Sequence, residues 1–316
     1  MMMRTAIAPA NIAFIKYWGK ADEALRLPLN PSISMNLSAC ITTTTVEFSP
    51  DFTEDEIKLL DGEFSADEIK RTIKSLELIR TKANKNYFAR VTTKNTFPKG
   101  AGAAASASGF AALTVAGFAA LGVNLSEKEL TSFARLGSGS ACRSIPDGFV
   151  QWNNEFAYSI HPPEYWDLRD ILVIVDAHMK KVSTTEGMKT VQTSPFLASR
   201  LAALPERIAR LKDAMQKKNF GTFGEIIEEE CLDMHHVMQT QTPPLFYWND
   251  TTKIVIDKVK NWRKDGLPVY FTIDAGPNVH LICEGNDEEK VMNKVKLLKG
   301  VKKIIVNKPA KGAHII

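Results

Sequence analysis

Residues 103–121 restrict the fold more than any other part of this chain, because nearly all of them are apolar and most are small. Alanine favours helices, and a helix that is apolar all round has no face suited to water, so we expect it in the centre of a domain. The preceding segment, Phe97 to Gly102, contains a proline and two glycines that interrupt regular structure. The sequence therefore predicts a buried helix directly after an irregular loop.

Length and composition indicate a globular protein. With 316 residues, of which 44% are hydrophobic, the chain can form one large or two ordinary domains. The formal charge is +4, and acidic and basic residues are interspersed. This pattern favours neither a nucleic-acid-binding stripe nor a polybasic membrane patch, whereas small anionic ligands are compatible with it.

The cysteines and the first residues bear on the compartment. Cys40, Cys142, Cys231 and Cys283 lie far apart and form no CxxC pair, so neither a zinc site nor a dense disulfide framework is indicated. The chain starts without the features of a signal peptide, and no apolar run reaches about 18 residues. We expect a soluble, cytoplasmic protein with no membrane or nucleic-acid partner.

The order of the predicted elements changes along the chain from strand-rich to helix-rich. A boundary near residues 180 to 190 follows, with a first domain at 1–185 and a second at 186–316, and no internal repeat is visible. Ser126 and Glu129 form a capping box before a helix. The other predicted strands cover 5–15, 41–48, 148–152, 169–176, 268–274 and 301–306, and the other helices most of 55–82, 205–219, 221–238 and 288–298.

Residues 137–144 form a compact set of hydrogen-bond donors. Three serines, Arg143 and two glycines occur there with no carboxylate among them, and the planar guanidinium suits a carboxylate or phosphate. Gly/Ser clusters are usually flexible turns. This one lies between a predicted helix at 126–136 and a predicted strand at 148–152, which favours an ordered junction that binds an anion.

Residues 98–109 have the composition of a phosphate-binding loop. Small residues leave backbone N–H groups accessible, and the helix after them directs the positive end of its dipole at a bound anion. The segment does not match GxxxxGK[ST], and Ala/Gly-rich helix starts often serve only close packing. Both interpretations stay open at this point.

Two further segments carry groups that can take part in catalysis. Residues 11–20 end an apolar strand with Lys16, Tyr17, Trp18 and Lys20, which an ordinary solvated strand end would also explain. Asp274 follows a predicted buried strand and precedes a sharp turn, where a carboxylate can face a cleft or simply stabilise the turn.

Together these segments resemble the GHMP family of small-molecule kinases and, within it, the diphosphomevalonate decarboxylases. The resemblance implies an α+β GHMP kinase fold of two α/β domains with the active site in the cleft between them, and commonly a homodimer. It implies that ATP, with Mg²⁺, phosphorylates the 3-hydroxyl of a mevalonate phosphate, which then loses phosphate and CO₂. The matching segments are 8–13, 15–20, the loop after Phe97-Pro98, 137–144, 242–246 and 274–278.

The resemblance also implies roles for individual residues. The catalytic residues are Asp274 beside the 3-hydroxyl, Lys16 next to it, and Arg143, which holds the substrate. No metal ligand is assigned. The other substrate contacts are Tyr17, Trp18, Gly19, Lys20, Ser138, Gly139, Ser140, Ala141, Cys142 and Thr184, and the contacts to ATP are Pro98, Gly100, Ala101, Gly102, Ala105, Ser106, Ala107 and Ser108.

Three departures from the family pattern bear on the choice of substrate. Ala105 replaces the first of two serines, Asp147 replaces a glycine near the anion segment, and Glu77 lies where members that bind a diphosphate carry an arginine. A diphosphate needs more cationic donors than a monophosphate. A phosphomevalonate decarboxylase acting on mevalonate 5-phosphate therefore stays an alternative, as do a 3-kinase without decarboxylation and a non-catalytic binding protein.

Overall fold

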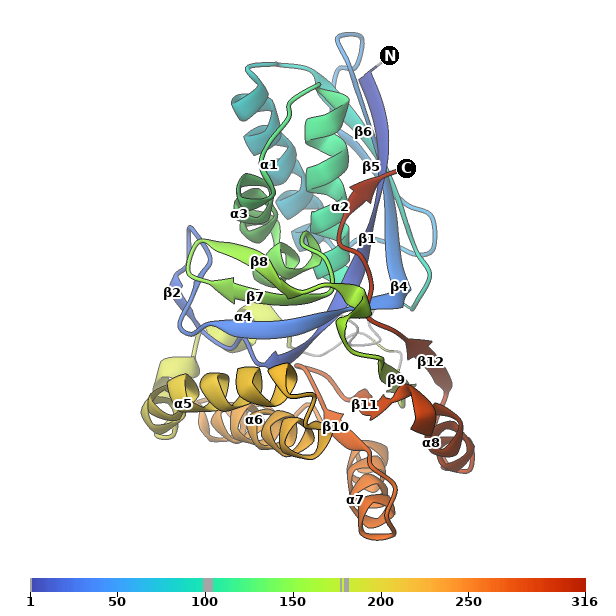
Figure 1. The fold of residues 1–316 in the computed structure, drawn as a ribbon. Helices are drawn as coiled ribbons and strands as arrows, with labels where there is room; N and C mark the ends of the chain where they lie inside the picture. The colour runs from blue at the N-terminus through green and yellow to red at the C-terminus, as the bar shows by residue number, and fades with distance from the viewer. Residues whose placement is uncertain (1, 99–104, 177, 179–181) are drawn as a thin grey trace.

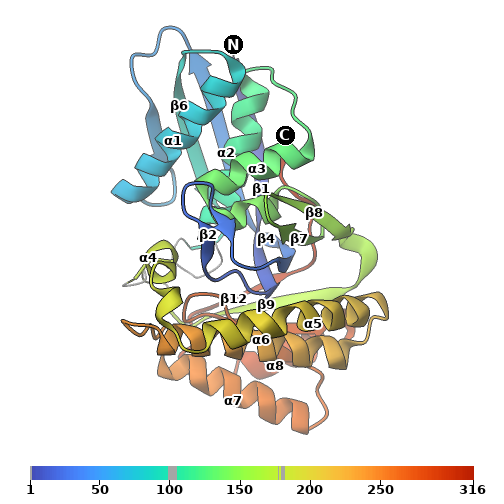
Figure 2. The ribbon, with the colours of Figure 1, turned by 90° about the vertical axis from the view of Figure 1, so that its left-hand side faces the viewer.

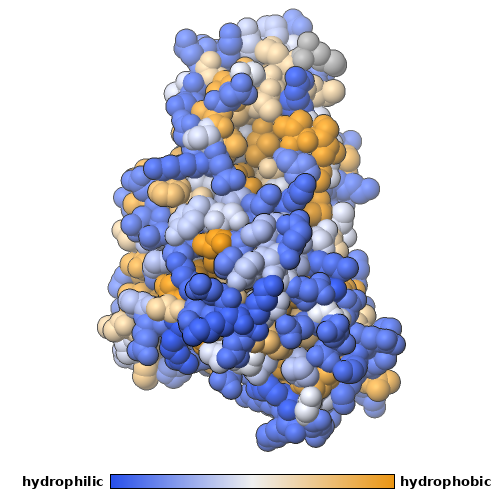
Figure 3. Space-filling model, viewed as in Figure 1, coloured by the Kyte–Doolittle hydropathy of each residue, from blue (hydrophilic) through white to orange (hydrophobic). Residues whose placement is uncertain are grey.

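Two β-sheets, each packed against helices, make up the protein (Figure 1). The structure is a computed structural model that describes residues 2–98, 105–176, 178 and 182–316. In this part of the chain no helix is both long and apolar enough to cross a bilayer. Polar residues cover most of the face seen in Figure 3, and hydrophobic residues gather in its upper part near α2 and the C-terminus.

The larger sheet has seven strands in the order β13-β1-β4-β6-β5, with β7 and β8 continuing from β4. The first half of β4 pairs with β7 and its second half with β6, so this one long strand spans both parts of the sheet. Only β5 and β6 pair in parallel. The strands are β1 (Met2–Ile15), β4 (Ser32–Ser49), β5 (Glu56–Leu59), β6 (Phe88–Asn95), β7 (Phe149–Asn153), β8 (Phe156–His161) and β13 (His314–Ile315).

Three helices cover one face of this sheet: α1 (Ala66–Ala83), α2 (Ala105–Ala120) and α3 (Glu127–Gly137). Most residues of α2 are buried, which confirms the predicted central helix. Its small residues permit close packing, because a Cβ on Gly117 would lie 2.8 Å from Ile79 Cδ1. The predicted capping box at Ser126 and Glu129 is present at the start of α3.

The smaller sheet has the order β10-β11-β9-β12. Leu172 and Ile174 of β9 pack with α5 and α6, whereas Ile171 and Val173 pack with α7 and α8, so helices cover both faces. Figure 2 shows α5 and α6 lying across the base of the larger sheet. The elements are β9 (Leu168–Ile174), α5 (Leu197–Gln216), α6 (Phe220–Thr240), α7 (Asp250–Lys264), β10 (Tyr270–Thr272), β11 (Val279–Glu284), α8 (Glu288–Val295) and β12 (Lys303–Asn307).

One continuous core joins the two sheets. Ile12 and Phe14 of β1 belong to the same buried cluster as Leu172 of β9 and Phe223 of α6. The rings of Phe14 and Phe223 meet edge to face with centroids 4.9 Å apart. The end of β1 is therefore fixed against α6, and this junction holds the site described below.

The predicted mixture of α and β elements is confirmed, with three corrections. Residues 56–59 form β5 rather than a turn, because Ile57 and Leu59 pair in parallel with β6. Helix α5 begins at Leu197 and contains Pro205, which was predicted to start it. Helix α7 was not predicted, although Val255, Ile256, Val259 and Trp262 follow a helical spacing. The domain boundary at 185/186 stays a prediction; β9 already belongs to the smaller sheet.

Candidate active site

A buried ion pair joins the ends of two strands from the two sheets. Lys16 directly follows β1, and Asp274 lies two residues beyond β10. Lys16 Nζ is 2.7 Å from Asp274 Oδ1 and also donates to the carbonyl of Ala13 at 2.7 Å. The Lys16 side chain is 1% exposed and that of Asp274 25%. The cation is therefore enclosed, while its carboxylate partner stays accessible.

Asp274 is held in its ionised form. Burial by itself raises the pKa of this carboxyl, but the charge and hydrogen bond of Lys16 outweigh burial, with smaller contributions from His280 and Arg143. The net result is a pKa below the ordinary value for aspartate. Asp274 is thus a carboxylate near neutral pH, able to accept a hydrogen bond or a proton from a hydroxyl.

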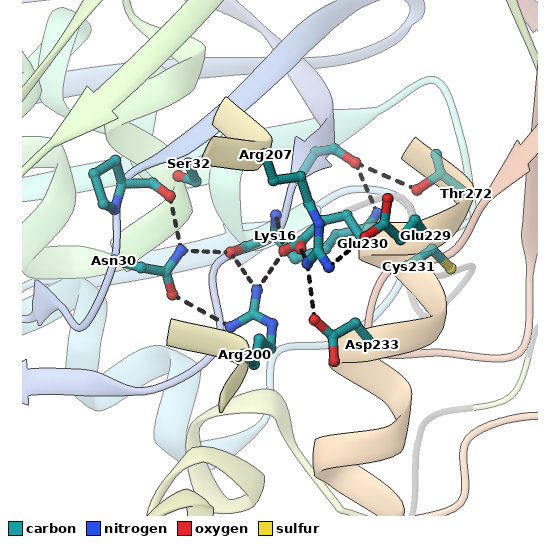
Figure 4. A network of polar contacts seen from close by, with 12 residues as sticks. Lys16, Asn30, Ser32, Arg200, Arg207, Glu229, Glu230, Cys231, Asp233 and Thr272 are labelled. Atoms are coloured by element: carbon teal, nitrogen blue, oxygen red, sulfur yellow. Dashed lines mark hydrogen bonds and ion pairs between the residues drawn. The ribbon is translucent and has the colours of Figure 1, made fainter. Parts of the chain in front are cut away.

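Behind Lys16 lies a set of buried charges, which we call the rear network: Arg200, Arg207 and Glu230 (Figure 4). Glu230 of α6 accepts from the Lys16 backbone N–H at 3.1 Å and from both arginines of α5. Arg200 also donates to the Lys16 carbonyl at 3.2 Å. Both backbone polar groups of Lys16 are therefore fixed, and its ammonium can point only toward Asp274.

Arg143 lies in the short 3₁₀ helix η1 (Gly139–Ser144), which confirms that the glycine- and serine-rich segment is ordered. Its guanidinium donates twice to Asn11 Oδ1, at 3.0 and 3.2 Å, and once to Ser32 Oγ at 2.8 Å. Asn11 in turn donates to Ser144 Oγ at 2.8 Å. Burial lowers the pKa of Arg143, yet it stays charged. Of its five N–H groups, the described residues engage three, which leaves donors for a ligand.

Tyr17 contributes a buried hydroxyl to the same region. Its ring meets Trp152 edge to face at 4.7 Å, and a Cβ at Gly139 would approach the Tyr17 hydroxyl oxygen to 2.8 Å. Position 139 therefore requires glycine. Within the described part of the chain the Tyr17 hydroxyl has no hydrogen-bond partner. A buried polar group without a partner is costly, so this hydroxyl is suited to contact a bound polar molecule.

Three cations gather beyond Tyr17, and we call Lys20, Arg26 and Arg71 the Arg26 cluster. Arg71 of α1 donates to the Gly137 carbonyl at 3.3 Å, and its other partner, Asp67, is exposed. Lys20 contacts the exposed Glu23. Burial, followed by repulsion from Arg71, lowers the pKa of Arg26, and Arg26 has no hydrogen bond within the described ranges. Like charges held together in this way favour a multiply charged anion.

The start of α2 meets the anion segment. Ser106 Oγ lies 3.3 Å from Ser138 Oγ, so the end of the predicted phosphate loop borders residues 137–144. Ala105 and Ser106 also line an open hollow of about 540 Å³, together with Thr42, Thr93 and Asn95 of the sheet. Pro98 precedes this region, and Gly100, Ala101 and Gly102 lie outside the described residues.

Several of the predicted contact residues lie in the packing around the site. The side chains of Trp18, Ala107, Ala141 and Cys142 are buried in hydrophobic clusters, so only their backbone atoms can face a ligand. Ser108 is fully buried and contacts Thr42 Oγ1 at 2.6 Å. Gly19 takes a φ of 100°, which permits a close turn after Trp18. Ser140 and Thr184 are half-buried, the latter at the start of α4 (Thr184–Met188).

The structure changes how two of the sequence departures are interpreted. Glu77 is exposed on α1, whereas Arg71 of the same helix reaches the anion segment, so the helix does supply an arginine. Asp147 accepts from the Gly312 N–H at 2.7 Å and fastens the C-terminal segment. Sequence reasoning missed Arg26 and Arg71, because their approach depends on the packing of a loop against α1.

A carboxylate paired with a buried lysine, next to an arginine- and serine-rich anion segment, defines an enzyme of the class that acts on small phosphorylated molecules. Residues 8–159 match the diphosphomevalonate decarboxylase-like N-terminal domain, and residues 171–312 match the mevalonate 5-diphosphate decarboxylase C-terminal domain. The diphosphomevalonate decarboxylase of Debaryomyces hansenii is 35% identical over 91% of this chain and 81% of its own.

Solved structures agree with this match. Mevalonate diphosphate decarboxylase from Staphylococcus aureus is 37% identical, with a TM-score of 0.94 over 99% of this chain and 98% of that one. A complex with MVAPP, AMPPCP and magnesium, also 37% identical, has a TM-score of 0.93 over the same shares. The chain belongs to the diphosphomevalonate decarboxylase family and is an ATP-dependent decarboxylase, and the predicted two-domain fold is confirmed.

Proposed function

We propose that the pocket around Lys16, Asp274 and Arg143 converts mevalonate 5-diphosphate and ATP to isopentenyl diphosphate, ADP, phosphate and CO₂. The observation that carries the assignment of residues is the 2.7 Å pair of Lys16 and Asp274. An enclosed cation holds an accessible carboxylate ionised, which is the arrangement needed to act on an otherwise unreactive tertiary hydroxyl.

The reaction has two parts. In the first, the 3-hydroxyl oxygen bonds to the γ-phosphorus of ATP, the bond from that phosphorus to the bridging oxygen breaks, and ADP leaves. In the second, the C3–O bond breaks and phosphate departs. The electron pair of the bond between C2 and the carboxylate carbon becomes the C2–C3 double bond, and CO₂ leaves.

Asp274 accepts the hydrogen bond of the 3-hydroxyl and takes up its proton as the new phosphorus–oxygen bond forms. Lys16 keeps this carboxylate in place and offsets the negative charge that develops during transfer. Because the rear network fixes the backbone of Lys16, this geometry exists before substrate binds. Such preorganisation avoids the cost of reorientation during the reaction.

The remaining groups orient the substrate. The donors that Arg143 retains, together with Ser138, Ser140 and the Tyr17 hydroxyl, bind the mevalonate carboxylate and the adjoining polar atoms. The Arg26 cluster binds the 5-diphosphate end, because its crowded cations gain most from a multiply charged anion. The presence of Arg71 supports the diphosphate over mevalonate 5-phosphate as the substrate.

The hollow at the start of α2 suits the nucleotide, since its volume of about 540 Å³ lies in the range of small-molecule sites. Ser106 then faces the phosphates of ATP. Among the described residues no three His, Cys, Asp or Glu side chains form a metal cluster. This donor set fits Mg²⁺, which is commonly held by nucleotide phosphates and water with few protein ligands, and which neutralises the triphosphate when bound.

Asp274→Asn tests the assignment. The variant keeps the shape of the side chain but loses its charge and basicity, so kcat is expected to fall at least about 10³-fold. Release of ADP and CO₂ should be measured together from mevalonate 5-diphosphate and ATP, and both should be lost. Asp176→Asn, which changes another aspartate after a buried strand, serves as the matched control. Turnover by the Asp274→Asn variant near the wild-type rate would remove Asp274 from this role.

The alternatives are separated by the same assay with two substrates. Side-by-side turnover of mevalonate 5-diphosphate and mevalonate 5-phosphate should favour the diphosphate in kcat/KM. Preference for the monophosphate would contradict the proposed role of the Arg26 cluster. Release of ADP without CO₂ would identify a 3-kinase, and no nucleotide hydrolysis with either compound a non-catalytic binding protein.

We also propose a cytoplasmic homodimer. Four free, buried cysteines support a reducing compartment. Light scattering coupled to size-exclusion chromatography tests the dimer, for which a mass near 35 kDa would contradict the proposal and a mass near twice that value would support it.

A further inference from the structure

The strand that leads to Asp274 is held along its outer edge by side chains instead of by another strand. β10 is the edge strand of the smaller sheet and pairs on one side with β11. On its other side the Phe271 N–H donates to Glu228 Oε1 at 3.0 Å, and the Ile273 N–H to Cys231 Sγ at 3.2 Å. Both acceptors belong to α6. The edge thus has side-chain partners for alternate backbone groups.

Glu228 and Cys231 are three residues apart on α6, and His235 follows four residues later on the same helix face. The His235 ring is 1% exposed, and the backbone of Ile273 and Asp274 hydrogen-bonds to it. The three side chains therefore contact successive points of the chain that ends at the catalytic carboxylate. Glu228 is itself anchored by Arg263 at 2.8 Å.

Trp248 determines which His235 nitrogen carries the proton. Its indole Nε1 lies 3.2 Å from His235 Nε2, and an indole N–H can only donate. The Nε2 atom is therefore the acceptor, and in the neutral ring the hydrogen is on Nδ1, available to the backbone carbonyls at Ile273 and Asp274. Burial, and then the charge of Lys16, lower the pKa of His235 to about 3, so the ring is neutral.

We propose that His235 is a positioning residue for Asp274, and that Trp248 orients His235 for this task. The ring does not contact Lys16 Nζ or the Asp274 carboxylate in the structure; it holds the backbone from which that carboxylate extends. A displacement of about 1 Å at a reacting group can cost on the order of 100-fold in rate. The inference rests on the proposed role of Asp274 and adds the support behind it.

Three variants on α6 test the proposal in the full-length protein. His235→Leu removes the donor to the backbone and should lower kcat about 10- to 100-fold, with KM for ATP and for mevalonate 5-diphosphate changed less than about 2-fold. His235→Asn keeps a donor near the Nδ1 position and should recover kcat to within about 3-fold of wild type. His236→Asn, the same change on the exposed side of the helix, should leave kcat unchanged.

A second arm stays decisive even where His235→Leu does not fold. Trp248→Phe removes only the indole N–H from the ring contact, so His235 loses the partner that fixes its tautomer. Long-range ¹H–¹⁵N spectra should show hydrogen on Nδ1 in wild type and a mixture of tautomers in the variant, with kcat lowered about 3- to 10-fold.

Two results would overturn the proposal: equal kcat in wild type, His235→Leu and Trp248→Phe, or hydrogen on Nε2 in the wild-type spectrum. A purely structural role predicts a lower melting temperature in His235→Leu with kcat unchanged, and that outcome also rejects the proposal. Failure here is distinguishable from failure of the proposed function, because Asp274→Asn would still abolish turnover if only the role of His235 were wrong.

Discussion

Two groups of arginines flank the catalytic pair, and they are held in opposite ways. In the rear network, Arg200 and Arg207 share Glu230, whose side chain is fully buried. In the Arg26 cluster, Arg26 and Arg71 lie close enough for Arg71 to lower the pKa of Arg26, and the carboxylates nearby are exposed. The first group is internally compensated, whereas the second has excess positive charge.

The difference indicates two tasks for one residue type. A buried arginine with a carboxylate partner contributes to a fixed backbone and loses its function when the partner is removed. Arginines that repel each other lower stability until an anion binds between them. Removing a charge from the rear network should therefore damage the fold, while removing one from the Arg26 cluster should damage binding.

The largest effect is expected from Glu230→Gln. This variant leaves Arg200 and Arg207 buried without their shared countercharge, and the Nε groups of both already lack partners among the described residues. Breaking a buried ion pair on one side costs about 3–5 kcal/mol. Chemical denaturation of both proteins measures this loss in the free energy of unfolding.

Glu229→Gln is the matched control for that experiment. Glu229 is the neighbouring residue and also pairs with Arg207, at 2.8 Å, but its side chain is 48% exposed. Exposed pairs contribute about 0–1 kcal/mol, so this variant should be almost as stable as wild type. If Glu230→Gln were equally mild, the rear network would not be the structural support that we describe.

Arg71→Gln should show the reverse behaviour. We expect KM for mevalonate 5-diphosphate to rise about 10- to 100-fold, since a charge-assisted hydrogen bond to an anion is worth about 1.5–3 kcal/mol. The free energy of unfolding should change by less than about 0.5 kcal/mol, because its present partner Asp67 is exposed. Steady-state kinetics and denaturation of the same preparation test both statements.

Arg80→Gln on the same helix provides the contrast. Arg80 pairs with Asp55 at 2.7 Å, and both side chains are largely buried. Its loss should lower stability and leave KM for the diphosphate unchanged. A change of KM in Arg80→Gln as large as that in Arg71→Gln would mean that α1 acts on binding through its general stability.

The contrast also explains how far sequence reasoning reached. Lys16, Arg143 and Asp274 were identified because each lies in a short segment whose composition is itself unusual, and the structure brings Lys16 and Asp274 into contact. Arg26 and Arg71 lie in ordinary charged sequence, and only the tertiary fold places them together. Glu77 was examined in place of Arg71, since spacing along a helix does not reveal which side packs on Phe110.

The rear network was missed for a related reason. Its members come from α5 and α6, which sequence periodicity predicts only approximately, and buried charges are not expected on a core-facing side. The same holds for β5 and α7, whose short or largely polar segments carry weak periodic signals. Local pattern predicted the strand ends and caps well, whereas contacts between distant charged residues required the fold.

The smallest effect is expected for Arg26→Gln without ligand. Arg26 has no hydrogen bond within the described residues and is repelled by Arg71, so its loss should leave stability equal or slightly higher. Inorganic pyrophosphate changes this. At ten times its Kd it should stabilise the wild type by about 1.4 kcal/mol, and the variant by less than half as much at the same concentration.

Melting temperatures with and without pyrophosphate measure the difference, and potassium chloride at equal ionic strength controls for general screening. Glu229→Gln, which lies in the other region, should respond to pyrophosphate as the wild type does. An equal response of Arg26→Gln and wild type would place the diphosphate elsewhere. The positive excess of the Arg26 cluster would then be compensated by the chain itself, and the distinction between the two groups of arginines would be lost.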